Sequence, residues 1–344
     1  IEVFQQCSFI AFAAVSSTVD EYPQRDGLLT TALAKYWLII KLMSKNHNMN
    51  LLSKYNNVAV IGLSCIFFLI SCDAKVEETS EITSPYPGYE LVWQDEFDAD
   101  GKPNIQDWSY ENGFVRNQEL QWYQEENANI RDGLLVIEGR RDSIPNPKYD
   151  PQSKDWKKNR EFGLYSSSSI NTAGKQTFQY GIIEVRAKID TAMGMWPAIW
   201  TLGVDKGWPA NGEVDIMEYY RVNGEGTILA NAAWAHETKR AAWDETKIPF
   251  SDFLEKDAEW PEKFHVWVME WTPENIRLSL DGELLNEIDL SLTVNPDGFN
   301  PFHQPHYILL NLAIGGNGGD PAETSFPKTY EVDYVRVYQQ IDAL

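Results

Sequence analysis

The sequence has few cysteines, and this limits how the chain can be cross-linked. Its 344 residues include only Cys7, Cys65 and Cys72. None follows residue 72, so a disulfide framework is excluded from the rest of the chain. Basic residues are also scarce, because 29 Lys and Arg face 51 Asp and Glu, for a formal net charge of −22. This balance argues against nucleic acid as a partner, since phosphates require a basic surface.

Apolar runs of membrane-spanning length are missing too. The apolar stretch 58–70 is too short to cross a bilayer comfortably, but it suits the core of a signal peptide. Lys54 precedes it, and Leu-Ile-Ser-Cys72 resembles a lipobox whose cysteine becomes lipidated. Segment 49–72 is therefore interpreted as a lipoprotein signal peptide. The alternative is a buried hydrophobic helix.

The signal-peptide interpretation also decides how the flanking segments are interpreted. Residues 1–48 precede a candidate start methionine and are interpreted as non-structural upstream sequence, and residues 73–87 as a linker rich in Ser, Thr and Pro. We expect an exported bacterial lipoprotein at the outer membrane or cell surface, or alternatively in the periplasm. Membrane contact would be through the lipid anchor on Cys72 alone.

Long apolar stripes at helical spacing are missing from residues 88–341, where strand patterns recur instead. Residues 180–189 and 330–338 alternate apolar and polar side chains with period two, and Asp281-Gly282 is a hairpin turn signal. Only residues 250–256 and a few short stretches have a helical pattern. Residues 143–160 have the composition of a surface loop. The pattern predicts one all-β domain, a sandwich of two antiparallel sheets.

Three acids lie close together in one predicted strand. Glu213 and Asp215 share a face because side chains alternate along a strand, whereas Glu218 is out of phase by one residue. If all three line one cleft, Ile216 or Met217 must form a β-bulge. Two adjacent carboxyl groups are the apparatus of retaining glycoside hydrolysis. An exposed acidic strand face or a calcium site are the alternatives.

This acid motif resembles the E-x-D-x-x-E signature of glycoside hydrolase family 16, in its laminarinase-like branch. The resemblance covers about residues 89–340 in order, through further stretches that include Trp93–Phe97, Asn117–Tyr123, Gly194–Trp200 and Val332–Tyr338. It implies a jelly-roll (concanavalin-like) sandwich with a concave substrate cleft. It also implies Glu213 as nucleophile, Glu218 as acid/base and Asp215 as the assisting acid, which hydrogen-bonds the nucleophile and helps keep Glu218 protonated.

The resemblance further implies binding residues and a metal site. The sugar-binding positions that it implies, or makes plausible, are Asn117, Trp196, Trp200, Trp234 and Asn311, with core packing as the alternative for Trp200. A structural Ca²⁺ would take main-chain oxygens of Glu96 and Gly133 and the side chain of Asp333. No catalytic metal or organic cofactor is implied.

Two positions depart from the family pattern. Ser169 lies where many laminarinases have an arginine, and a histidine often found after the catalytic strand is not evident, with Trp234 near its place. Both changes affect sugar subsites.

The function expected is endo-hydrolysis of β-1,3- or mixed-linkage β-1,3-1,4-glucan with retention, by a protein that is expected to be monomeric. One alternative is hydrolysis of agar- or carrageenan-type galactans. Their sulfate groups would require basic residues near the acid motif, and no basic cluster is evident there. The other is a glycan-binding surface protein on the same sandwich, against which three crowded carboxylates argue. The choice between water and a sugar acceptor is not readable from the sequence.

Overall fold

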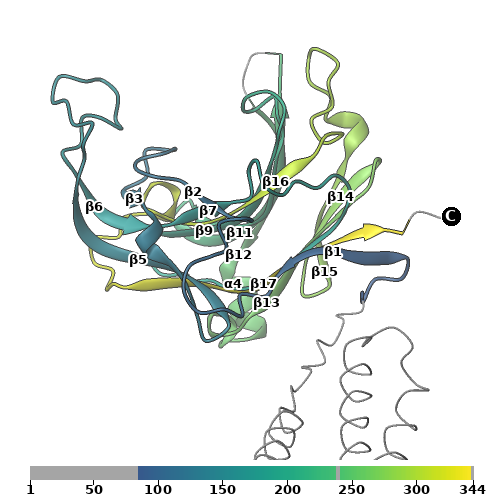
Figure 1. The fold of residues 1–344 in the computed structure, drawn as a ribbon, viewed down its shortest axis with the longest axis horizontal. Helices are drawn as coiled ribbons and strands as arrows, with labels where there is room; N and C mark the ends of the chain where they lie inside the picture. The colour runs from purple at the N-terminus through teal and green to yellow at the C-terminus, as the bar shows by residue number, and fades with distance from the viewer. Residues whose placement is uncertain (1–83, 238–240, 342–344) are drawn as a thin grey trace, which may run out of the picture. The chain divides into compact units, whose positions relative to one another are not determined.

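The computed structural model describes residues 84–237 and 241–341. The predicted signal peptide, Cys72 and most of the predicted linker lie outside the described residues. The described chain forms two β-sheets that stack as a sandwich (Figure 1). None of its helices has both the length and the apolar character needed to cross a membrane.

The first sheet has ten strands, and its longest strand lies near the middle. β17 (Lys328–Gln340) pairs with β8 on one side and β5 on the other, and β1 also pairs with β17. Every pairing in this sheet is antiparallel except that of β3 with β6. The path is β15 (Glu283–Asp289), β14 (Asn275–Leu280), β13 (His265–Trp271), β8 (Gly181–Lys188), β17, β5 (Leu134–Pro145), β6 (Phe162–Ser167) and β3 (Gln121–Tyr123), with β1 (Tyr89–Asp95) on β17 and β4 (Ala128–Arg131) on β5.

The second sheet has seven strands, all antiparallel, and it holds the predicted acid strand as β10 (Glu213–Val222). The order is β12 (Ala241–Pro249), β11 (Glu225–Ala235), β10, β9 (Met195–Gly203), β16 (His306–Ile314), β7 (Ser169–Asn171) and β2 (Ser109–Tyr110). The connection from β5 to β6 rises on one side of this sheet, and the segment between β15 and β16 rises on the other (Figure 1). These segments leave an open face between them.

Helical structure in the described residues is short. The helix α4 (Phe250–Lys256) matches the predicted helical stretch 250–256, and it buries Phe250 and Phe253 against the core. The other helical segments are single 3-10 turns: η1 (Glu125–Asn127), η2 (Trp260–Glu262), η3 (Leu290–Leu292) and η4 (Gly316–Gly318).

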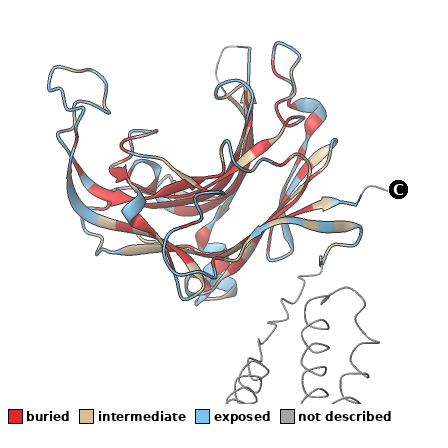
Figure 2. Ribbon diagram, in the orientation of Figure 1, coloured by how far each residue is buried: buried red, intermediate tan, exposed pale blue. Residues whose placement is uncertain are grey.

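The hydrophobic core lies between the two sheets (Figure 2). Alternate residues of β8 and β17, such as Val185 and Val337, meet alternate residues of β16, such as Leu310 and Leu312, and all four are fully buried. Each such side chain contributes about 1.5–3 kcal/mol relative to exposure. The other face of the second sheet is therefore free to carry polar chemistry, and the predicted sandwich is confirmed.

Candidate active site

A β-bulge in β10 brings the three acids onto one face. Between Asp215 and Glu218, β10 has one residue more than β11 opposite it, and the register against β9 shifts at the same point. Ile216 and Met217 both pack into the core between the sheets. This extra inward residue restores Glu218 to the face of Asp215. The predicted bulge is confirmed.

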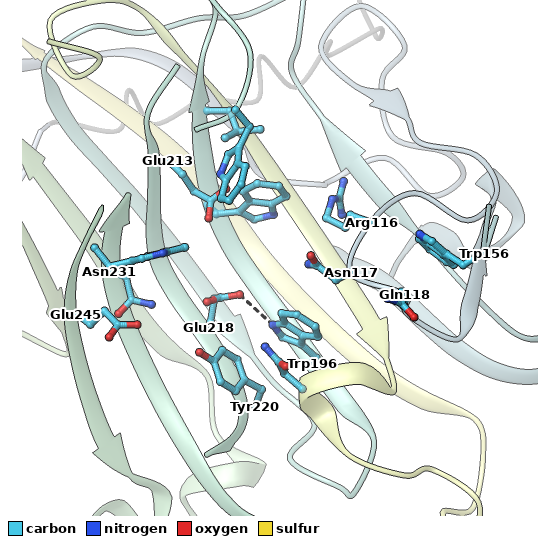
Figure 3. A pocket seen from close by; sticks show the side chains of 15 residues that line it. Arg116, Asn117, Gln118, Trp156, Trp196, Glu213, Glu218, Tyr220, Asn231 and Glu245 are labelled. Atoms are coloured by element: carbon cyan, nitrogen blue, oxygen red, sulfur yellow. Dashed lines mark hydrogen bonds between the residues drawn. The ribbon is translucent and has the colours of Figure 1, made fainter. Parts of the chain in front are cut away.

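The three acids differ in their surroundings. Asp215 is buried, at 2% exposure, and accepts a hydrogen bond from Asn231 Nδ2 at 3.4 Å, whereas Glu213 and Glu218 are partly buried. Trp196 Nε1 donates to Glu218 Oε1 at 2.9 Å (Figure 3). The expected hydrogen bond from Asp215 to the nucleophile is not among those formed by the described residues, because Asp215 is turned to Asn231 on the neighbouring strand.

Both glutamates have pKa values above the ordinary value for a glutamate side chain. Burial raises the pKa of Glu213 to about 7, although a hydrogen bond from Trp208 and the positive charge of Arg116 act in the opposite direction. Burial and the negative charge of Glu213 raise the pKa of Glu218 to about 8. Burial and both glutamates hold the pKa of Asp215 well above its ordinary value. Ionisation of one glutamate disfavours ionisation of the other, so the pair favours a state in which one carboxyl group holds a proton, as a nucleophile and its acid partner require.

These raised pKa values predict a stability cost that grows with pH. A carboxyl group whose pKa is higher in the folded state favours folding when protonated, so stability falls as pH rises from about 4.5 toward 8. Glu218→Gln removes an ionisable group but keeps an acceptor for Trp196. We expect it to raise the melting temperature by about 2–5 °C at pH 8 and by much less at pH 5.

The control for this prediction is Glu283→Gln, at an exposed glutamate on the other sheet. It should leave the melting temperature within about 1 °C at both pH values. A Glu218→Gln variant that is less stable than the parent at pH 8 would contradict the prediction.

An open cleft of about 770 Å³ runs over the face that carries the acids. Figure 3 shows Glu213 and Glu218 between Asn231 and Glu245 on one side and Arg116, Asn117 and Trp156 on the other. A smaller chamber of about 60 Å³ is shared by both glutamates and Asp215. The cleft is lined by Arg116, Asn117, Gln118, Trp156, Trp196, Trp200, Leu202, Trp208, Glu213, Glu218, Tyr220, Asn231, Trp243, Glu245 and Asn317.

Four of the five predicted sugar-binding residues lie at this site. Asn117, Trp196 and Trp200 line both the cleft and the chamber, and Asn311 lines the chamber. Trp200 Nε1 donates to Asn311 Oδ1 at 2.7 Å, which fixes the indole plane. Trp200 packs with residues on the cleft side of the sheet, separate from the main core.

Trp234 lies on the other side of β11, and the expectation that it lines the cleft is corrected. Asn231 faces the acids, and because side chains alternate, a residue three positions later faces the core. Trp234 accordingly packs against the main core. The apolar residues of β11 give its two faces similar patterns, so the sequence did not distinguish them.

Several cleft residues were not predicted. Trp208 and Trp243 expose 56% and 41% of their surface, unusually high values for an indole. Trp156 belongs to the loop between β5 and β6, and Arg116 to the segment before β3. The high tryptophan content was the one sequence signal for these cleft residues. They come from segments that are far apart in the sequence, so no local pattern marks them.

The predicted calcium ligands are the main-chain oxygens of Glu96 and Gly133 and the carboxylate of Asp333. The carboxylate of Asp333 is paired with Arg186, and the side chain of Glu96 with Arg336. Gly133 lies in a turn with φ of +73°. The described chain contains no group of three His, Cys, Asp or Glu side chains suited to a metal. Calcium binding stays a prediction, which a comparison of melting temperatures in Ca²⁺ and in EDTA tests.

A β-sandwich with two glutamates on one face of a strand in a tryptophan-lined cleft is the arrangement of a glycoside hydrolase. The chain belongs to the family described as Glycosyl hydrolases family 16, whose sequence profile it matches over residues 115–336. The laminarinase-like resemblance is thereby confirmed.

Individual relatives agree with this assignment. The chain is 34% identical over 295 residues to a beta-glucanase of Rhodothermus marinus, covering 80% of this chain and 92% of the relative. Among solved structures, it is 34% identical to one reported for endo-acting O-glycanases that human gut microbiota use in mucin breakdown, with a TM-score of 0.67 and coverage of 75% and 93%. It is also 34% identical to SCLam, a non-specific endo-β-1,3(4)-glucanase, with a TM-score of 0.61 and coverage of 75% and 94%.

Proposed function

We infer that the chain is a retaining endo-β-glucanase that hydrolyses β-1,3- or mixed-linkage β-1,3-1,4-glucan. The observation that carries the inference is the pair Glu213 and Glu218, held on one face of β10 by the bulge, with the pKa of each raised by burial. The cleft of about 770 Å³ has room for more than one sugar unit, which suits endo-cleavage.

The reaction follows from the protonation states of the two glutamates. Ionised Glu213 attacks the anomeric carbon while protonated Glu218 gives its proton to the departing glycosidic oxygen, which leaves a covalent glycosyl-enzyme. Glu218, now ionised, accepts a proton from water as the water releases the sugar, and the configuration is retained. The hydrogen bond from Trp196 holds the Glu218 carboxyl group in place between these steps.

Two relatives point to different glycans, and one experiment separates them. The similarity to SCLam favours glucan, whereas the similarity to endo-acting O-glycanases of mucin breakdown favours a mucin O-glycan as the second candidate. The purified chain is tested for release of reducing ends from laminarin, barley β-glucan, mucin O-glycans, agarose and carrageenan. Activity on laminarin or barley β-glucan supports the proposal, and activity on the other glycans alone overturns the glucan assignment.

The loop between β5 and β6 adds a wall to the cleft. Trp156 lies 5.9 Å from the ring of Phe114, and the guanidinium of Arg160 covers Trp156 at 4.9 Å and Phe114 at 5.1 Å. Arg160 Nη2 also donates to the main-chain oxygen of Gln118 at 2.9 Å. The indole is therefore held by its neighbours while it lines the cleft, as a stacking platform for a distal sugar.

Trp156→Ala is expected to raise KM for long oligosaccharides about 3- to 10-fold, the loss expected for one aromatic contact. KM for the shortest cleaved oligosaccharide should not change, because that substrate ends before the loop. The control is Tyr149→Ala, an exposed aromatic residue in the same loop that does not line the cleft. Equal losses on short and long substrates would contradict a distal role for Trp156.

We propose that the chain acts outside the cytoplasm as a lipoprotein anchored through Cys72. The support is the sequence alone: an apolar segment, a lipobox-like ending and a polar linker before the first strand. Labelling with radioactive palmitate in a bacterial host should mark the parent but not Cys72→Ala. Equal labelling of both would overturn the proposal.

A further inference from the structure

Among the residues that the structure describes, Arg116 is the only Arg or Lys that lines the cleft and the smaller chamber beside Glu213 and Glu218. Its guanidinium carbon lies 5.0 Å from the ring centre of Trp200 and 5.8 Å from that of Tyr123. Figure 3 shows the side chain on the side of the cleft opposite Asn231 and Glu245. The stacking on two buried aromatic rings restricts the guanidinium to a narrow range of positions.

One end of the guanidinium is anchored by a short chain of polar contacts. Arg116 Nη2 is paired with Glu111, and Ser169 Oγ donates to the same carboxylate at 2.6 Å. Ser169 is the position at which the family resemblance led us to expect an arginine. A serine there leaves Glu111 free to hold an arginine that arrives from a different segment.

Nη1, the other terminal nitrogen of the guanidinium, has no hydrogen-bond partner among the described residues. Arg116 Nη1 is buried and forms no hydrogen bond with any residue that the structure describes. A buried donor normally has an acceptor, so an unpartnered one at a substrate cleft marks a place for a ligand atom. The chamber that Arg116 lines with Glu213 measures about 60 Å³, which suits a substituent of a sugar ring better than a whole ring.

We propose that Arg116 is a specificity-determining residue whose Nη1 donates a hydrogen bond to an uncharged oxygen of the sugar bound beside Glu213. The proposal rests on the proposed hydrolase function and adds a substrate class to it. Glu111 already balances the charge of Arg116, and the ionised Glu213 adds a negative charge at the same chamber. An additional sulfate or carboxylate would therefore meet a net negative surrounding, and the site selects neutral glycans.

Arg116 also acts on the nucleophile through space. Its positive charge lowers the pKa of Glu213 and opposes the effect of burial. Removal of the charge should move the acidic limb of the pH profile of kcat/KM to higher pH. A purely structural role for Arg116 would not move that limb, so the profile separates the two roles.

The experiment compares Arg116→Gln with the parent and with Arg131→Gln, a matched change at a largely exposed arginine on β4. On neutral glucan oligosaccharides, Arg116→Gln should lower kcat/KM about 10- to 100-fold, the loss expected for one charged hydrogen bond. Arg116→Gln should also move the acidic limb of the pH profile of kcat/KM to higher pH. Arg131→Gln should change neither kcat/KM nor the position of this limb. Arg116→Gln should not gain activity on sulfated glycan, because loss of the positive charge leaves the surroundings of the chamber more negative.

Binding to inactive protein provides a second measurement. In a Glu213→Gln background, the addition of Arg116→Gln should weaken oligosaccharide binding at least 10-fold while the melting temperature shows that the protein remains folded. Unchanged kcat/KM, pH profile and affinity would overturn the role of Arg116. Absence of activity in the parent on every glycan would instead overturn the proposed function, so the two failures are distinguishable.

Discussion

Glu213→Gln should reduce hydrolysis of the polysaccharide by about 10⁵-fold, the order of magnitude seen when a covalent nucleophile is removed. The amide of glutamine has no charge with which to attack the anomeric carbon, so the glycosyl-enzyme does not form. Its oxygen still accepts a hydrogen bond at the position where the Glu213 carboxylate receives one from Trp208. The cleft and its tryptophans should therefore continue to bind glycan.

Rates and binding are measured on the same preparation. Initial rates of reducing-end release give the loss of turnover, and calorimetry with an oligosaccharide gives the affinity. Glu283→Gln on the other sheet is the matched control and should keep full activity. Turnover above about a tenth of the parent value would show that another carboxylate is the nucleophile, with Glu119 at the chamber as the next candidate.

Glu218→Ala should reduce hydrolysis of the polysaccharide by about 10³- to 10⁴-fold, at the upper end of what general acid–base catalysis supplies. The loss should be much smaller for an aryl glycoside with an acidic phenol, because that leaving group departs without a proton. The second step still lacks its base, so glycosyl-enzyme should accumulate. Azide, which needs no base, should restore turnover and give a product of retained configuration.

The rescue assigns the roles of the two glutamates. Azide should accelerate Glu218→Ala and should not restore the retaining reaction in Glu213→Gln. An azide product of inverted configuration from Glu218→Ala would show that Glu218 is the nucleophile instead. Trp196→Phe is a useful companion, since it removes the indole donor from Glu218 but keeps an aromatic ring in the cleft.

The acid strand was predictable from sequence because side-chain alternation is a strict geometric rule. Glu213, Asp215 and Glu218 share a face only if one extra residue is inserted, and the register shows that insertion at Ile216 and Met217. The stretch that forms α4 was recognisable for the same reason, because the spacing of its apolar residues changes from that of a strand to that of a helix. In both cases, the spacing of residues along a short segment was enough to predict the local structure.

The rest of the site depends on which segments meet in space. Arg116 and Trp156 reach the cleft from connections between strands, and no local period indicates the direction of a loop side chain. Trp234 was misplaced because both faces of β11 carry apolar residues, so the sequence of the strand did not show which face points to the core. The role of Ser169 became visible only once Glu111 and Arg116 were placed beside it.

The bulge in β10 also bears on how this gene tolerates the loss of a codon. Deletion of Ile216 or Met217 would leave an ordinary strand in which Glu218 again shares a face with Asp215, at the cost of one core side chain. Deletion of Val214 would instead turn Glu213 away from Asp215. Between Glu213 and Glu218, the bulge is thus the point at which the coding sequence can change length by one codon and keep the acids together.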